Sequence, residues 1–429
     1  MQIYFRTITF FLGEIYLKKL IYKMNDILFI LMLIYVFMLN FAIKGINDIL
    51  FILLSIVFII NIYYNKNNLE KLPRWIGIFV GIFCLSMLLL SFTSPDVQES
   101  FKIVRRLIKY MFPFIIIFYC INDKRKIQII FFTLLGSIFL EVIYALFMSS
   151  SNFYDVIFNN IPYRMQGYPP EPGKWPTFML FSMKLEFFLS IIYILLLVQK
   201  QFIKRLIIFI PLLIGLIALF FNNTRMAWLI IALMFIIISY LYIKNKKILI
   251  MLLLGISIFS LGIIYTQPWI QQRIDNTLHM KDGSSQLHYM FVQDSLEMIK
   301  EKPIIGWGIG QFKKYYNESF RSDKTNYLIE KYHENTPVPY AHNMVIDLMV
   351  ETGVIGTIMY IICYGYFLFF SFYDWYKKRL VSGLMFFSIT LCFILHGFSE
   401  KTLEFNVIVQ YFYCCLGMYL AYRKYEIRR

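Results

Sequence analysis

The chain has 429 residues, of which 59% are hydrophobic and 16% are charged, and its formal net charge is +16. Soluble globular proteins carry about a quarter charged residues, so this composition excludes an ordinary soluble fold. The positive charge does not indicate a nucleic-acid-binding protein, because the basic residues lie mainly in short clusters between apolar runs.

Apolar runs recur along the whole chain, and a run of about 20 residues is long enough to cross a bilayer core. A helix satisfies its own backbone hydrogen bonds in lipid, so the sequence predicts an all-α polytopic membrane protein with about twelve transmembrane helices. The predicted spans are 26–43, 48–64, 76–93, 107–121, 128–149, 177–198, 206–222, 226–243, 248–267, 343–371, 381–397 and 406–422.

These spans divide the chain into three regions. Residues 1–267 form a transmembrane bundle of about nine spans after a short basic lead, and residues 343–429 add about three more. Residues 268–342, between the ninth and tenth spans, form a large loop that is partly helical, with apolar residues at helical spacing over 284–301. The lead is either an interfacial helix or the result of start-site choice, since Met24 begins directly at the first span.

Basic clusters in alternate loops predict the orientation. They include Lys124-Arg125-Lys126, Lys244-Asn245-Lys246-Lys247 and Lys377-Lys378-Arg379. Cytoplasmic loops carry the excess of Lys and Arg, so both termini are predicted to be cytoplasmic and the loops 150–176 and 268–342 to face outward. No ATP or nucleotide sugar is available outside, and the chain has no P-loop pattern. A reaction there would need an already activated donor, such as a lipid-linked diphosphate.

Neither a disulfide framework nor a metal site is predicted. The six cysteines lie in apolar segments without a CxxC spacing. His396 and Glu400 are placed to share a helix face, but no third ligand is evident. We expect no metal and no cofactor, and a structural or substrate-facing role for these two residues.

Two junctions between an outer loop and a span carry the residues best suited to chemistry. Arg225 lies where a guanidinium can bind a phosphate bidentately near the headgroup level. His342 can take a proton from a sugar hydroxyl, because its pKa lies near neutrality. Taken singly, each residue is better explained structurally, as a snorkelling arginine and as a histidine that caps a helix start.

Two outer loops hold further candidates. Gly306 and Gly308 belong to a glycine-rich run that permits tight turns or close approach to a ligand. Arg164 and Glu171 lie in a loop rich in Pro and Gly, where they contact substrate or pair with each other.

The order and spacing of these motifs resemble the bacterial O-antigen ligase and O-antigen polymerase superfamily. The resemblance covers about 160–360 by motif and the whole chain by topology. The matching motifs are the arginine at a span junction (Thr224-Arg225-Met226-Ala227-Trp228), a P-x-x-G-x-G turn (Pro303 to Gly308), an H-N pair (His342-Asn343), an E-x-G-x-x-G run (Glu351, Gly353, Gly356) and an R-x-x-G…E-P loop (Arg164, Gly167, Glu171, Pro172). The ordered set favours functional roles for Arg225 and His342.

One position departs from the family pattern. In the helix before the motif proline, members usually carry an arginine where this chain has His288. Either Arg273 or a protonated His288 would have to substitute for it as an anion-binding group.

The resemblance implies a metal-independent glycosyltransferase on the outer face of the bacterial inner membrane. Its donor would be a glycan on undecaprenyl diphosphate, and its acceptor a hydroxyl. On this interpretation His342 deprotonates the acceptor and Arg225 stabilises the leaving diphosphate. The residues expected to bind substrate are Arg164, Glu171, Arg273, His288, Gly306, Gly308 and Asn343.

Three functions remain open. The leading hypothesis is a polymerase that joins lipid-linked repeat units into a surface polysaccharide such as O-antigen. Its partners would be both lipid-linked substrates, membrane lipid, and a chain-length regulator and flippase of the same pathway. The alternative is an O-antigen ligase that transfers the glycan to lipid A core or another acceptor. A lipid-linked glycan transporter would instead need polar residues through the midplane and on both sides.

Overall fold

The computed structural model describes residues 24–41, 45–65, 72–121, 123–159, 165–167, 177–332 and 337–427. It is 84% helical, and these residues form no strand. Within them, seven helical segments are long and apolar enough to cross a membrane, and Met24–Met38 and α17 (Val381–His396) are apolar but shorter. The seven comprise α2 (Ile46–Asn65), α3 (Arg74–Ser91), α6 (Lys124–Ser149) with the short turns after it, α8 (Thr177–Val198), α9 (Phe202–Asn222), α10 (Arg225–Tyr242) and α16 (Met344–Lys378). The predicted all-α polytopic membrane fold is confirmed.

The predicted span 107–121 is not one helix. An amphipathic helix, α4 (Val97–Met111), is capped at its start by Asp96, whose carboxylate accepts a hydrogen bond of 3.0 Å from the backbone of Glu99. A second helix, α5 (Pro113–Cys120), begins at a proline, which has no N–H to donate and therefore starts a helix more easily than it continues one. The predicted spans 248–267 and 406–422 correspond to α11 (Lys246–Thr266) and α18 (Asn406–Ile427).

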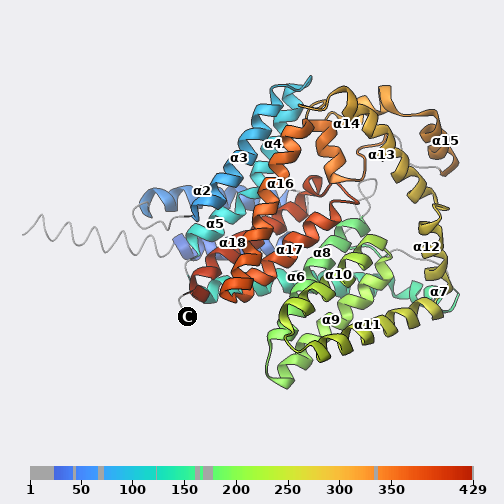
Figure 1. Cartoon of the computed structure of the whole chain (residues 1–429). Coiled ribbons are helices and arrows are strands. Elements are labelled where there is room, and N and C mark those ends of the chain that lie inside the picture. Colours follow the sequence, from blue (N-terminus) through green and yellow to red (C-terminus); the bar gives the residue numbers. More distant parts are fainter. Residues whose placement is uncertain are drawn as a thin grey trace, which may run out of the picture.

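The segment between α11 and α16 is helical over most of its described length. It contains α12 (Pro268–Leu278), α13 (Gly283–Glu301), α14 (Phe312–Tyr315), a π turn (Tyr316–Phe320) and α15 (Asp323–Tyr332). In Figure 1 these short helices form an arc along one side of the bundle. The helix predicted over 284–301 is α13, and its apolar face packs with α15 in a small core of its own around Met290, Phe291 and Leu328.

Contacts at the two ends of α16 show which helix ends lie together. At one, the backbone N–H of Met344 donates to the carbonyl of Gly397 (2.6 Å), which joins the start of α16 to the end of α17. At the other, Asp374 of α16 pairs with Arg423 of α18. The start of α16 and the end of α17, which the charge pattern assigns to one side of the membrane, thus lie together, as do the end of α16 and the end of α18, which it assigns to the other. Which end faces the cytoplasm stays a prediction.

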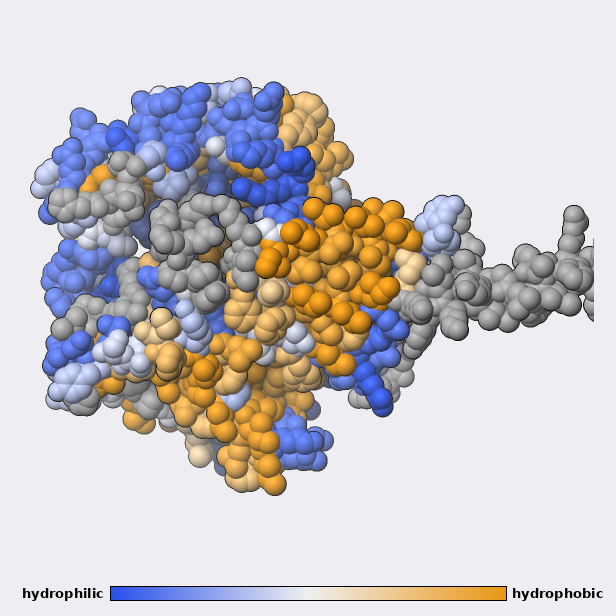
Figure 2. All heavy atoms as spheres, turned by 180° about the vertical axis from the view of Figure 1, so that it is seen from behind, coloured by the Kyte–Doolittle hydropathy of each residue, from blue (hydrophilic) through white to orange (hydrophobic). Residues whose placement is uncertain are grey.

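Large apolar side chains are exposed on the outer helices of the bundle. Examples are Ile59 of α2 (64% exposed), Phe202 of α9 (73%) and Tyr265 of α11 (83%). Figure 2, which views the molecule from behind, shows a broad hydrophobic area, with hydrophilic residues gathered towards its edges. An apolar surface of this extent is expected where a helix bundle contacts lipid.

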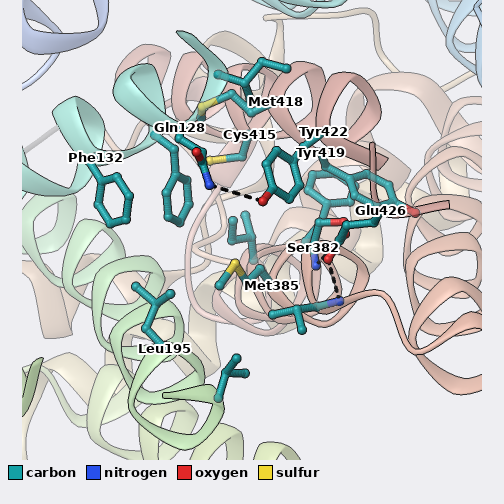
Figure 3. Close-up of a pocket in the computed structure, with 16 residues that line it drawn as sticks. Gln128, Phe132, Leu195, Ser382, Met385, Cys415, Met418, Tyr419, Tyr422 and Glu426 are labelled. Atoms are coloured by element: carbon teal, nitrogen blue, oxygen red, sulfur yellow. Dashed lines mark hydrogen bonds between the residues drawn. The ribbon is translucent and has the colours of Figure 1, made fainter. Parts of the chain in front are cut away.

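An apolar pocket of about 290 Å³ lies between α6, α8, α17 and α18, at the end of α17 opposite His396 (Figure 3). Its few polar side chains are hydrogen-bonded. The amide of Gln128 donates to the Tyr422 hydroxyl (3.2 Å), and Glu426 accepts from the backbone N–H of Ser382 (3.2 Å) at the start of α17. Glu426 therefore caps the start of α17.

A kink in α16 joins the bundle to the segment before it. Gly353 has φ 61°, in the left-handed region that favours glycine, and interrupts the helix. The groups freed by the kink pair with the turn 303–308. Trp307 donates its backbone N–H to the Val350 carbonyl (2.7 Å), and Val354 donates to the Pro303 carbonyl (2.8 Å). Two of the recognised motifs therefore form one structural unit.

We expect Gly353→Ala to destabilise the protein by about 1–3 kcal/mol, because alanine at this φ is strained. In addition, the new Cβ would overlap the carbonyl group of Ile304. Gly365, on the same helix, is the matched control, since a Cβ there meets nothing within 4 Å. Thermal unfolding of both variants in detergent tests this. Equal unfolding temperatures would contradict a structural role for the kink.

Candidate active site

The candidate site is centred on a histidine and a carboxylate brought together from two loops. Nδ1 of His342, just before α16, lies 3.3 Å from Oε2 and 3.4 Å from Oε1 of Glu400, which follows α17. The Tyr340 hydroxyl donates to Oε2 of the same carboxylate (3.1 Å). The side chain of Glu400 is 4% exposed and that of His342 is 17% exposed. The pair is thus sheltered but open on the histidine side.

The local backbone explains why His342 occupies this position. Its φ is 55°, a left-handed conformation that is uncommon for histidine. Asn343 then caps α16, since its side-chain oxygen accepts hydrogen bonds from the backbone N–H groups of Val345 (3.0 Å) and Ile346 (3.2 Å). Its amide nitrogen donates to the carbonyl of Phe398 (3.2 Å). The H-N motif therefore fixes the turn that presents His342. A substrate contact for Asn343 stays a prediction.

Electrostatics keep Glu400 ionised. Burial alone would raise the pKa of Glu400, but the charge of and hydrogen bond from the neighbouring His342 lower it below its usual value. A carboxylate at Nδ1 favours the tautomer that carries its proton there, so Nε2 is the nitrogen that points away from Glu400. This arrangement is the one required to orient and strengthen a histidine base.

His288 of α13 stacks on His342, with ring centroids 4.4 Å apart and planes 15° apart. Burial, followed by the charges of His342 and Arg225, lowers the pKa of His288 to about 4. The ring is therefore neutral at neutral pH, which does not favour the alternative of a protonated His288 as an anion-binding group. It instead packs against the face of the His342 ring.

Arg225 begins α10 and reaches the start of α13. Its Nη1 lies 2.9 Å from Oδ2 of Asp282 and 3.1 Å from Oγ of Ser285, and it also donates to Thr277. Burial alone would raise the pKa of Asp282, but hydrogen bonds from Arg225 and Ser285 lower it. The guanidinium is one quarter exposed. Ser285 precedes His288 by three residues on α13, so Arg225 reaches the helix face that carries the stacked histidines.

One of the remaining candidates, Arg273, is described near this arginine. Arg273 of α12 donates to the carbonyl of Asn223 (3.4 Å), two residues before Arg225. The neighbouring Asn222 donates to the carbonyls of Met165 (3.0 Å) and Phe178 (2.9 Å), which ties residues 165–167 to the same corner. That Arg273 substitutes for the arginine missing at 288 stays a prediction.

Gly306 and Gly308 contact protein backbone and side chains. A Cβ on Gly306 would lie 2.5 Å from the carbonyl carbon of Glu351, and one on Gly308 would overlap Ser94. Both have positive φ, so only glycine fits the turn against α16 comfortably. This packing explains both glycines without a ligand, and their predicted substrate contact stays a prediction.

Arg164 and Glu171 lie outside the described residues, as does His333, another possible base. Among the residues that are described, no group of three or more His, Cys, Asp or Glu side chains is arranged to hold a metal ion.

Sequence reasoning missed the pairing of Glu400 with His342 and two buried pairs on α8. Lys184 binds Glu141 of α6 (2.7 Å), and Glu186 lies 2.7 Å from Nδ1 of His396 of α17. The available signal was the presence of Lys184 and Glu186 inside an apolar span, where ionisable residues need a partner. The partners themselves follow only from helix packing.

Residues 210–361 match the family model described as O-antigen ligase. This segment carries the O-antigen ligase-family domain. It contains Arg225, His288 and His342, so the family resemblance inferred from the motifs is confirmed. No curated protein matches the chain. The family match supports a glycosyl-transferring role in the synthesis of a surface polysaccharide, as ligase or polymerase.

Proposed function

We propose that the protein is a polymerase that transfers a lipid-linked glycan to a lipid-linked repeat unit on the outer face of the inner membrane. The observation that carries this proposal is the convergence of Arg225, His342 and Glu400, from three distant parts of the chain, around one face of α13. A base beside a cationic group suits transfer from a diphosphate donor. The donor is activated already, so the reaction needs proton removal and charge stabilisation.

His342 acts as the general base in this mechanism. Nε2 takes the proton of the acceptor hydroxyl as the oxygen attacks the anomeric carbon, and the bond from that carbon to the diphosphate breaks. The electron pair of the broken bond leaves with the diphosphate. Glu400 accepts a hydrogen bond from the Nδ1–H group and thereby stabilises the imidazolium that forms. Direct attack from the far side would invert the anomeric centre.

Arg225 stabilises charge on the leaving diphosphate, with Arg273 and Arg164 as further cations. The bonds from Arg225 to Asp282 and Ser285 hold its guanidinium in place before substrate arrives. A preorganised cation in a partly dry site costs little reorganisation as negative charge develops. No step of this scheme calls for a metal ion.

The ligase is the second candidate, favoured because the matching family is described as O-antigen ligase. Purified protein given only lipid-linked repeat units distinguishes the two functions. A ladder of longer lipid-linked glycans indicates a polymerase. A product that appears only when lipid A core is added indicates a ligase. Movement of the lipid across vesicles without any new glycosidic bond would contradict both and favour a transporter.

We expect Glu400→Gln to shift the pH profile of transfer and to lower its maximum. Without the carboxylate the imidazolium is less stable, so the pKa of His342 falls and the acid limb of the profile moves to lower pH. The weaker base then lowers the plateau rate by at least about tenfold, or ~1.4 kcal/mol. Rates measured from pH 5 to 9 test this. An unshifted acid limb would show that Glu400 does not act through His342.

A further inference from the structure

A second carboxylate–histidine pair lies directly behind the first, inside the bundle. Oε1 of Glu186 on α8 is 2.7 Å from Nδ1 of His396, the last residue of α17. The side chains of Glu186 and His396 are 0% and 2% exposed. Within the described residues, the other oxygen of Glu186, Oε2, is buried without a hydrogen-bond partner. A buried carboxylate with one unsatisfied oxygen is costly to fold, which suggests a functional reason to keep it.

The two pairs are connected through the end of α17. The backbone N–H of Glu400 donates to the carbonyl of His396 (3.1 Å), so the carboxylate is one helical turn beyond the buried histidine. The charge of His396 is among those that lower the pKa of Glu400. Glu186, His396, Glu400 and His342 thus form a row in which acid and base alternate.

The groups that face this row come from every element packed around it. Glu400 is faced by His342, by His288 of α13 and by the Tyr340 hydroxyl. His396 is faced by Glu186 of α8 and by Glu400. Of these contacts, only the one from Glu186 reaches the row from inside the bundle.

We propose that Glu186 and His396 are positioning residues that act on the base through Glu400. This inference rests on the proposed function, since it presumes that His342 is the base. The contact between Glu186 and Nδ1 of His396 fixes the end of α17, and the turn that follows holds the Glu400 carboxylate in place against Nδ1 of His342. The pair does not touch substrate. Its effect is on how strongly His342 binds the proton that it removes from the acceptor.

The test replaces Glu186 by glutamine, which keeps its size and removes its charge. We expect kcat to fall about tenfold, KM to stay within about twofold, and the acid limb of the pH profile to move to lower pH, as for Glu400→Gln. Glu186→Asp keeps the charge and should restore the wild-type limb. A pair that serves only stability would lower the amount of folded protein and leave the limb where it is.

Two controls separate this inference from the function itself. Glu404→Gln removes a carboxylate that pairs with Lys401 in the same loop (3.4 Å) and should leave the limb unchanged. If Glu186→Gln unfolds the protein, His396→Gln provides a second route to the same measurement. If His342 and Glu400 variants lose activity while Glu186→Gln and His396→Gln keep the wild-type profile, the inference is wrong and the function stands. If His342 variants stay active, the assignment of the base fails.

Discussion

Replacing His342 with asparagine is expected to lower the rate of glycosyl transfer by about 10²–10⁴-fold, the range typical of general-base catalysis. Asparagine is chosen because position 342 has φ 55°, and asparagine adopts left-handed backbone far more readily than alanine does. The variant therefore removes the base without adding backbone strain. Initial rates with saturating lipid-linked donor, per mole of folded protein, provide the measurement.

His279→Asn is the matched control for this change. Its side chain is 62% exposed, and Nδ1 lies 2.8 Å from the carboxylate of Asp275, so it is also a histidine beside an acid. It lies near the end of α12, away from the stacked rings of His288 and His342. Wild-type rates are expected for the control. Wild-type activity of His342→Asn at normal expression would instead mean that another group removes the proton.

The sequence was sufficient for the fold class, whereas the roles of the site residues stay predictions. Apolar runs predicted the membrane helices because in lipid the backbone must bond within one segment. The ordered motifs identified Arg225 and His342, and the segment that contains both matches the family model. The sequence did not predict that the helix ends before Pro113, because the apolar run of α5 continues the apolar face of α4 without interruption.

The partners of the site residues could not be predicted. Nothing in the sequence indicated that Glu400 pairs with His342, which lies far from it in the chain. Asp282 was not considered, although it holds Arg225. Ion pairs between distant segments depend on how helices pack in three dimensions, which hydrophobic periodicity does not encode. The glycine motifs were taken as possible ligand contacts, but the kink at Gly353 and the turn at Gly306 fit one another.

Replacing Arg225 with alanine is the second decisive change, with an expected loss of about 10²–10³-fold in kcat, comparable to removing one oxyanion donor. Arg225→Lys should recover only part of this loss, because an ammonium group cannot bind phosphate bidentately. Arg105→Ala, an exposed arginine of α4, is the control and should leave transfer unchanged. Product formation from lipid-linked substrate is the measurement.

The bond between Arg225 and Asp282 offers a structural explanation of such a loss, in place of a catalytic one. A second variant separates the two explanations. Asp282→Asn breaks the ion pair and weakens the cap of α13, where Asp282 accepts a hydrogen bond from the backbone of Ser285 (2.9 Å), but it keeps the guanidinium. If Arg225 only braces α10 against α13, both variants should lose stability and activity alike. If it stabilises the diphosphate, Asp282→Asn should lose stability but retain most of kcat, and only Arg225→Ala should lose both. Equal losses in kcat per folded molecule would therefore remove Arg225 from the catalytic scheme.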